Sequence, residues 1–233
     1  MSAKAETGLA GLAQDKNDEE TPVKLYGYFR SSAAYRVRIA LNLKKLPYDH
    51  QSVHLTRNGG WQWSEEYRAV NPQKRVPALA LDSGDILLQS LAIVEYLDEV
   101  HPRPPLLPAD AIERAQVRAF AQIIACDIHP LNNLVALNYL KGPLKHEQVQ
   151  VDDWYRNWVV QGFDALEALI RPGPYAFGAH VTLADICLVP QVFNARRFKV
   201  DMAKYPKLAA AEAACQKLPA FDKARPENQP DAE

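Results

Sequence analysis

The most constraining feature of this sequence is a cluster of prolines near its middle. Four prolines fall within the eight residues from His101 to Pro108. Because proline lacks a backbone N–H and cannot continue a helix, this segment predicts a linker. Short strand-like and helical patterns alternate before it, whereas almost everything after it has helical periodicity. The 233-residue chain is therefore expected to form a small α/β domain followed by an all-helical domain.

The proline cluster and the change of periodicity also predict where each domain begins and ends. We expect the α/β domain over residues 22–102, the linker over 103–108 and the helical domain over 109–225. Residues 1–21 are small and polar, without apolar periodicity, which predicts a disordered N-terminal extension. Residues 226–233 have the same character and predict a flexible tail.

The first hundred residues predict the element order β-α-β-α-β-β-α. The expected strands span 24–29, 49–55, 76–81 and 86–88. The first helix is expected to start at an N-cap on Ser31 or Ser32, to carry the apolar run 37–43 and to end at 46–48. The polar segment 57–70 would hold the second helix, and the third is expected over 91–100. The first two strands flank a helix, which implies a parallel pair with a right-handed crossover. The last two form a hairpin. Beyond the linker, helices are expected over 111–140, 145–170, 182–195 and 207–218.

Charge and cysteine content exclude several classes of protein. The 27 basic and 28 acidic residues give a net charge of −1, which offers no electrostatic basis for binding nucleic acid or a membrane. The three cysteines lack CxxC spacing, so neither a disulfide framework nor a metal site is indicated. No apolar run approaches the roughly 20 residues that span a bilayer, and no signal-peptide pattern is present. A reducing, cytoplasmic location is expected.

Three short motifs each allow a structural and a functional interpretation. At Ser31–Ser32 two hydroxyls at a helix start can lower the pKa of a bound thiol, or they can act only as a cap. At Gln89–Ser90 a helix start can hold a carboxylate, with the same structural alternative. Val76–Pro77 opens a strand, either as a trans edge proline or as a cis proline that leaves the Val76 backbone free for a peptide-like ligand.

Other polar residues have simpler interpretations. Thr182 and Asp185 have the spacing of a capping box, which predicts the fixed start of a core helix. Arg197 follows that helix, where it can complement the helix dipole or bind a carboxylate, and Arg30 allows a similar pair of interpretations. No P-loop, GxGxxG or HExxH motif occurs, which argues against nucleotide binding and zinc proteolysis.

The order of these motifs resembles that of the cytosolic glutathione transferases, in particular the zeta class. The resemblance extends from Lys24 to about Phe221. The stretches that carry it are Tyr28–Leu41 with its Ser-Ser-x-x-x-Arg core, Asn71–Leu79, Gln89–Leu97, Leu106–Pro108, Pro130–Leu134, Asp185–Val192 and Asn194–Val200. It implies a thioredoxin-like N-terminal domain, a helical C-terminal domain, glutathione as cofactor and a homodimer. One departure is Ala33, where eukaryotic members have cysteine, so any reactive thiol here would belong to glutathione.

The resemblance implies an isomerase with glutathione transferase side activity. The implied reaction is cis–trans isomerisation of maleylacetoacetate to fumarylacetoacetate in tyrosine breakdown, through reversible addition of a thiolate. The substrate would be a small dicarboxylic keto acid. Maleylpyruvate isomerisation, transfer to or dehalogenation of small α-halo acids, and non-catalytic glutathione binding remain alternatives. Apolar residues at Leu134–Val135, where a further arginine could sit, favour maleylacetoacetate.

The resemblance also implies the roles of individual residues. Ser31 would stabilise the thiolate, supported by Ser32 and Arg36. Pro77 would be cis, and Val76 would pair with the cysteinyl backbone of glutathione. The other implied glutathione contacts are Gln62, Gln89, Ser90, His129 and Asn133. Arg197 and Arg30 would face the carboxylates of the substrate, and no metal is implied.

Overall fold

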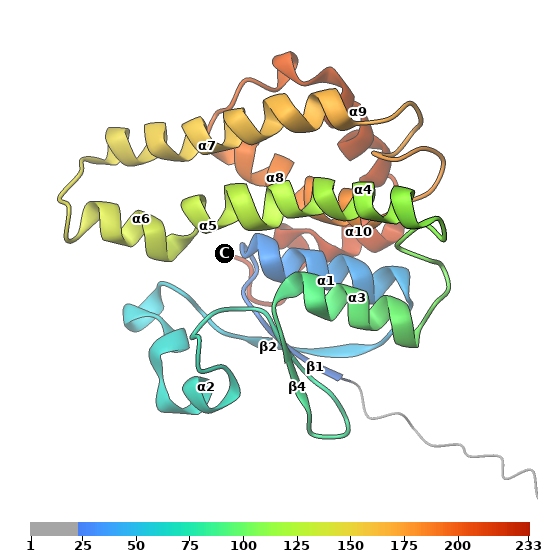
Figure 1. Cartoon of the computed structure of the whole chain (residues 1–233). Helices are drawn as coiled ribbons and strands as arrows, with labels where there is room; N and C mark the ends of the chain where they lie inside the picture. Colours follow the sequence, from blue (N-terminus) through green and yellow to red (C-terminus); the bar gives the residue numbers. More distant parts are fainter. Residues whose placement is uncertain (1–22) are drawn as a thin grey trace, which may run out of the picture.

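The structure, a computed structural model, describes residues 23–233 (Figure 1). The extension expected at residues 1–21 lies outside the described residues. The first domain is built on a four-stranded sheet of order β2-β1-β3-β4. Its strands are β1 (Val23–Gly27), β2 (Tyr48–Ser52), β3 (Ala78–Ala80) and β4 (Ile86–Leu88). Strand β1 pairs parallel with β2 and antiparallel with β3, and β3 and β4 form a hairpin. The expected crossover and hairpin are therefore confirmed.

The helices of the first domain are α1 (Ser32–Leu43), α2 (Glu65–Val70) and α3 (Ser90–Val100). Helix α1 is the central element of the molecule, because every residue from Ser32 to Leu41 is buried. It packs against α3 of its own domain and against α8 and α10 of the second domain. Its buried residues include Arg36 and Arg38 as well as apolar side chains. The start of α1 is therefore fixed from both domains.

The second domain is helical throughout (Figure 1). Its elements are α4 (Ala111–Gln122), the π-helical turn η3 (Ile123–Ile128), α5 (His129–Asn132), α6 (Leu134–Lys141), α7 (Gln148–Leu169), α8 (Leu183–Arg197), α9 (Pro206–Cys215) and α10 (Pro219–Ala224). No helix among residues 23–233 is long and apolar enough to span a bilayer. A thioredoxin-like domain followed by a helical domain is the expected fold class, and it is confirmed.

The single helix expected over 111–140 is wrong, because the chain is interrupted between η3 and α6. The chain stays helical through Pro130, which lies in the first turn of α5, and α5 ends at Asn132. At Asn133 the backbone becomes extended, with φ −77° and ψ 163°. Its side chain then caps α6 by accepting hydrogen bonds from the amides of Val135 (2.9 Å) and Ala136 (3.3 Å).

Helix α8 forms the core of the second domain, and its start confirms the expected capping box. The side chain of Thr182 accepts a hydrogen bond from the backbone N–H of Asp185, and the side chain of Asp185 accepts one from the backbone N–H of Thr182. Asp185 is fully buried and also accepts a hydrogen bond from the amide of Ala176 at 2.7 Å. One carboxylate therefore joins the helix start to the preceding loop.

Residues 226–233 do not form the expected flexible tail. They contain the 3-10 turn Pro226–Asn228, and Gln229 is buried with its amide nitrogen bonded to the carbonyl of Arg225 at 2.7 Å. Asp231 is hydrogen-bonded to the first domain. Polar side chains of this segment form hydrogen bonds with residues distant in the sequence. Such contacts cannot be predicted from the composition of the segment alone.

Candidate active site

A cavity of about 310 Å³ lies where the two domains meet. It combines the turn before α1, the segments around α2, the connection η3–α6 and the end of α8. Eight of the predicted site residues line it, namely Arg30, Ser31, Ser32, Gln62, Val76, His129, Asn133 and Arg197. Arg36, Gln89 and Ser90 do not. The fold therefore brings together most of the predicted residues from distant parts of the sequence.

The cavity wall is strongly cationic. Four positively charged side chains line it, Arg30, Lys74, Arg75 and Arg197, and no aspartate or glutamate does. Sequence reasoning missed Lys74 and Arg75, although both directly precede the Val76–Pro77 motif that it singled out. A cleft with charge of one sign concentrates ligands of the opposite sign. The wall therefore suits a ligand with several negative charges.

Ser31 occupies the N-cap position of α1. Its backbone is extended, with φ −69° and ψ 115°, and its Oγ accepts a hydrogen bond from the amide of Ala34 at 3.2 Å. This bond uses the oxygen as an acceptor and leaves the hydroxyl hydrogen available to a ligand. The helix N-terminus adds a partial positive charge at the same place. Ser31 can therefore donate a hydrogen bond to an anionic atom in the cavity.

Ser32 has a different environment, although it is the next residue. It is buried, and its Oγ lies 3.2 Å from Nδ1 of His129 in the second domain. Burial, together with the positive charges of Arg36 and Arg75, lowers the pKa of His129 to about 3. The imidazole is therefore neutral near neutral pH. The pair forms a polar contact between the two domains. Ser32 is therefore less available than Ser31 to donate a hydrogen bond to a ligand.

The low pKa of His129 gives a testable dependence of stability on pH. The folded-state pKa of about 3 lies below the value of about 6.5 in an unfolded chain. Between these values the unfolded chain binds a proton that the folded protein does not, so stability falls as the pH decreases. The His129→Gln variant should lose this contribution, which has a slope of at most about 1.4 kcal/mol per pH unit.

Urea unfolding measured from pH 7.5 to pH 4.5 tests this expectation. The exposed histidine His146, on the connection between α6 and α7, provides the control substitution His146→Gln. The control should follow the wild-type curve, and His129→Gln should give a flatter one. Parallel curves for all three proteins would show that His129 carries a proton in the folded state as readily as in the unfolded chain.

Arg36 lies behind the cavity wall and is almost completely buried. Its Nη1 donates a hydrogen bond to Ser90 Oγ at 3.2 Å. Within residues 23–233, its Nε and Nη2 atoms have no hydrogen-bond partner. Burial lowers the pKa of the guanidinium. Arg36 therefore places a poorly compensated positive charge between the starts of α1 and α3.

The helix start at Gln89–Ser90 differs from the expectation. Ser90 was expected to cap a helix beginning at residue 91, but it is the first residue of α3, and Gln89 occupies the N-cap position with φ 68°. This left-handed conformation directs Ser90 inward toward Arg36. Gln89 is exposed, and its amide nitrogen donates to Gln73 at 2.8 Å. Neither Gln89 nor Ser90 lines the cavity.

Gln62 and Val76 each present unused polar atoms. Gln62 lies in the 3-10 turn η2 (Trp61–Trp63), is buried, and donates from Nε2 to the carbonyl of Leu55 at 3.1 Å. Its Oε1 has no partner within residues 23–233. The Val76–Pro77 peptide bond is cis, as the resemblance implied. Strand β3 begins only at Ala78, and the backbone groups of Val76 make no hydrogen bond to any described residue.

The two predicted carboxylate-binding arginines come from different domains. Arg30 stacks over the ring of Phe29 at 5.0 Å and donates to the Tyr28 hydroxyl at 2.8 Å. Arg197, at the end of α8, donates to Asn194 at 3.4 Å. Burial, and then the nearby charge of Arg30, lower the pKa of Arg197. Neither guanidinium has a carboxylate partner within residues 23–233, so both are available to an anionic ligand.

Asn133 is the predicted site residue whose polar atoms are most fully used within the protein. Its Oδ1 caps α6, and its Nδ2 donates to the carbonyl of Pro130 at 2.9 Å. Its neighbour Asn132 is buried and has a free Nδ2 among the described residues. Asn132 also lines the cavity. No local pattern distinguishes these two asparagines in the sequence.

Comparison with known proteins agrees with this geometry. The family model for the glutathione S-transferase N-terminal domain matches residues 25–105, and that for the C-terminal domain matches residues 149–211. A probable maleylacetoacetate isomerase of Vibrio cholerae is 52% identical over 210 residues, which are 89% of this chain and 97% of that protein.

Solved structures give the same result. The holo structure of a maleylpyruvate isomerase, a bacterial glutathione S-transferase of the zeta class, has a TM-score of 0.87 and 47% identity, covering 90% of this chain and 100% of that one. A maleylacetoacetate isomerase from Anaeromyxobacter dehalogenans with glutathione in its active site has a TM-score of 0.82 and 40% identity, covering 91% and 98%. By its sequence, its fold and the arrangement of its cavity, the chain belongs to the glutathione S-transferase family, within the zeta class.

Proposed function

We propose that this protein is a glutathione-dependent isomerase that converts maleylacetoacetate to fumarylacetoacetate. One observation carries the proposal. The cavity combines a hydroxyl at a helix N-terminus with four cationic side chains and no acidic ones. Such a wall suits two anionic molecules bound together, a peptide thiol and a dicarboxylic keto acid. Relatives named as maleylacetoacetate isomerases, at up to 52% identity, support the same choice of substrate.

The residues present fit glutathione. It is a peptide with two carboxylates, an amine and a thiol, so it needs cationic groups, amide partners and a thiol-stabilising donor. Gln62 offers a buried Oε1 without a partner, and Val76 offers free backbone groups. Lys74 and Arg75 offer positive charge beside them. A buried polar atom that lacks a partner is rare in a folded protein, which indicates that the ligand supplies one.

When bound, glutathione supplies the sulfur that adds reversibly to the cis double bond, so that this bond can rotate before the sulfur leaves. The protein's own residues keep the sulfur ionised. Ser31 donates its hydroxyl hydrogen toward the sulfur, and the N-terminus of α1 adds its dipole. Ser32 is bonded to His129, which favours Ser31 as the direct contact. Arg36 adds a buried positive charge from behind the wall.

The acid is held by arginines of the cavity wall. Arg197 and Arg30 line the cavity from opposite domains, so a substrate with two carboxylates can pair with both, whereas a monoacid can pair with only one. They orient the substrate and stabilise negative charge that develops during the reaction. Leu134, Val135 and Leu137 line the same region with apolar surface. This surface favours the longer maleylacetoacetate over maleylpyruvate, which remains the second candidate because of the 47% identical solved relative.

An assay of the purified protein with three substrates tests the proposal. Maleylacetoacetate, maleylpyruvate and a small α-halo acid are each supplied with and without glutathione, and the ultraviolet spectrum is followed. We expect isomerisation only with glutathione, with kcat/KM about 10-fold higher for maleylacetoacetate than for maleylpyruvate. A higher value for maleylpyruvate would establish the second candidate. Turnover of the halo acid alone would refute isomerisation as the function.

A matched pair of variants tests the role of Arg197. Arg196 and Arg197 are adjacent at the end of α8 and both are exposed, but Arg196 is bonded to Glu212 and absent from the cavity wall. Arg197→Gln should raise KM for the acid by about 10- to 100-fold, since it removes a charge-assisted contact. Arg196→Gln should leave KM unchanged. Equal effects of the two substitutions would remove Arg197 from the binding site.

We propose that the protein acts in the cytoplasm as a homodimer. Three free cysteines support a reducing compartment. Large apolar side chains are exposed on α6 and near the start of α7, among them Tyr139 (58%), Leu144 (50%) and Val149 (62%). Burying this surface against a second copy would stabilise it. Light scattering after size-exclusion chromatography distinguishes a dimer from a monomer.

A further inference from the structure

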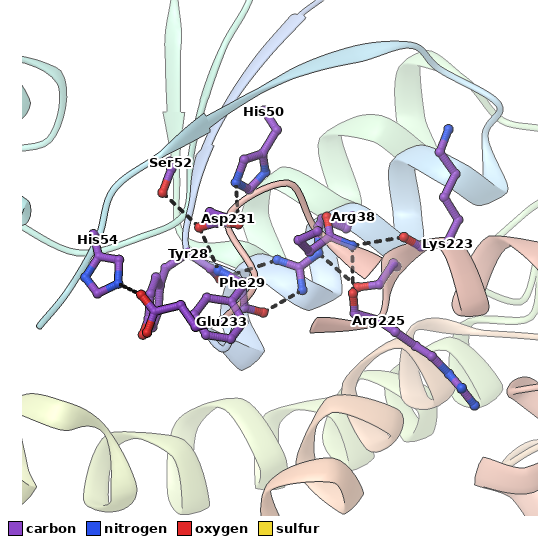
Figure 2. Close-up of polar contacts among 12 residues, drawn as sticks. Tyr28, Phe29, Arg38, His50, Ser52, His54, Lys223, Arg225, Asp231 and Glu233 are labelled. Carbon is purple, nitrogen blue, oxygen red and sulfur yellow. Dashed lines mark hydrogen bonds and ion pairs between the residues drawn. The ribbon is translucent and has the colours of Figure 1, made fainter. Parts of the chain in front are cut away.

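The segment 226–233 crosses the turn that carries Ser31 (Figure 2). Its Asp231 carboxylate binds the first domain at three points. Oδ2 accepts from the backbone amide of Phe29 at 3.2 Å and from the hydroxyl of Ser52 at 2.8 Å. Oδ1 lies 3.1 Å from Nε2 of His50. The end of β1, the end of β2 and the C-terminal segment are therefore joined by one side chain.

The Phe29 amide has no other partner within residues 23–233. The last backbone bond between β1 and β2 runs from the amide of Val53 to the carbonyl of Gly27, at 2.6 Å. Phe29 lies beyond this bond and is buried, with 5% of its surface exposed. Buried backbone N–H groups are almost always paired. Asp231 therefore supplies a partner that the sheet does not.

The carbonyl groups of the same turn are held by Arg38, which is fully buried. Its Nη2 donates to the carbonyl of Phe29 at 3.0 Å, and its Nη1 approaches the carbonyl of Tyr28 at 3.4 Å. Its Nε donates to the carbonyl of Ala224, at the end of α10, at 3.0 Å. The turn is thus fixed on its amide side by Asp231 and on its carbonyl side by Arg38, and both depend on the chain from α10 onward.

Glu233 makes a second attachment beside the first (Figure 2). His54 Nδ1 accepts from the amides of Thr56 (3.3 Å) and Arg57 (2.9 Å), so its hydrogen is on Nε2. That nitrogen lies 2.6 Å from the Glu233 carboxylate, which also pairs with Arg57 at 2.7 Å. Leu55 and Thr56 of this loop line the cavity. The C-terminal segment therefore contacts two separate parts of the cavity wall from behind.

We propose that Asp231 is a positioning residue, which fixes the Phe29–Ser31 turn and thereby aims the Ser31 hydroxyl into the cavity. Ser31 is two residues beyond the bonded amide, and its own amide donates to the carbonyl of Tyr28 at 2.9 Å. Displacement of this turn moves the hydroxyl and Arg30 together. The effect on chemistry rests on the proposed function, because it requires that Ser31 stabilises a thiolate.

The ionisation of Asp231 agrees with this role. Burial favours the neutral carboxyl, but hydrogen bonds from His50, Ser52 and Phe29 outweigh it and lower the pKa. The group therefore acts as an anionic acceptor for Phe29 and Ser52, and the His50 ring lies 3.1 Å from its other oxygen. Asparagine retains one carbonyl acceptor of nearly the same shape, whereas alanine retains none. The pair Asp231→Asn and Asp231→Ala thus separates hydrogen-bond acceptance from mere occupancy of the position.

The decisive experiment measures bound glutathione and the Phe29 amide in these variants. In Asp231→Ala we expect the apparent pKa of the bound thiol, followed by thiolate absorbance, to rise by about 1 unit. We expect kcat to fall about 10-fold, because a small displacement of a catalytic group chiefly affects the transition state, and KM for the acid to rise by a smaller factor, because Arg30 moves with the turn. Hydrogen exchange of the Phe29 amide should become faster. Asp231→Asn should restore most of each property.

Asn42→Ala is the matched control. Asn42 donates from α1 to the carbonyl of Ala220 in α10 at 2.9 Å, so it also joins the first domain to the last part of the second domain. Asn42 makes no hydrogen bond to the Phe29 turn, and Arg38 keeps its own bonds there in the variant, so the loss of Asn42 should change stability without changing the thiol pKa or kcat. The proposal is overturned if Asp231→Ala retains wild-type thiol pKa and Phe29 exchange, or if Asn42→Ala shifts them equally. A wild-type protein that fails to bind glutathione would instead refute the proposed function.

Discussion

Replacing Ser31 with alanine is expected to lower kcat/KM by about 100- to 1,000-fold, which is the usual cost of removing one donor to a developing or bound anion. The fold should survive, because loss of the Ala34 amide contact removes only a helix cap, at a cost of about 1 kcal/mol. The pKa of bound glutathione should rise in parallel. Steady-state kinetics and thiolate absorbance measure the two effects on the same preparation.

Two further variants isolate the hydroxyl from the cap. Ser64 is the N-cap of α2 and accepts from the amide of Tyr67 at 3.1 Å, which closely matches the geometry at Ser31. Ser64→Ala should lose a similar amount of stability and keep full activity. Ser31→Thr retains a hydroxyl and should keep measurable activity. Wild-type kinetics in Ser31→Ala, or an equal loss in Ser64→Ala, would assign thiolate stabilisation to another group.

Replacing Asp185 with alanine is expected to produce the largest loss of stability, about 3 kcal/mol or more. Its carboxylate accepts from the amides of Ala176 at 2.7 Å and Thr182 at 2.8 Å, and from the Thr182 hydroxyl at 3.1 Å. Alanine would leave these buried donors without a partner, and each unsatisfied donor costs about 1–3 kcal/mol. A domain is stable by only about 5–15 kcal/mol, so the variant approaches global unfolding.

Asp110→Ala provides the exposed counterpart. Asp110 caps α4 by accepting from the amides of Ile112 and Glu113, both at 2.9 Å, but it lies at the surface, where water can replace it. Its loss should cost about 1 kcal/mol. Urea unfolding followed by circular dichroism compares the two, and Asp185→Asn serves where the alanine variant does not accumulate. Equal losses for Asp110→Ala and Asp185→Ala would show that burial adds nothing to this cap.

Features of the fold that depend on neighbouring residues were predictable from the sequence. The cap at Ser31 and the box at Thr182–Asp185 each involve residues three positions apart, and the proline cluster marks the change from α/β to helical structure. The break before α6 lies at Asn133, and asparagine is a typical N-cap residue, a signal that apolar periodicity alone does not include. Gln89 carried no such signal, because glutamine is not a residue typical of a left-handed N-cap.

Features that depend on distant residues were not predictable in this way. The conformation at Pro77 stayed undecided from its local sequence, and only the family resemblance indicated cis. Lys74 and Arg75 became part of the cavity through the path of the chain before β3. The attachment of Asp231 joins residues 202 positions apart, and no local pattern encodes such a contact.

That separation has a consequence for how the protein is made. The turn at Phe29 belongs to a domain that leaves the ribosome early, yet Asp231, the acceptor for its amide, is synthesised some 200 residues later. At a synthesis rate of about 5–20 residues per second, the N-terminal domain waits at least about 10 seconds for this partner. The Phe29–Ser31 turn therefore reaches its final arrangement only after the last residues of the chain have been added.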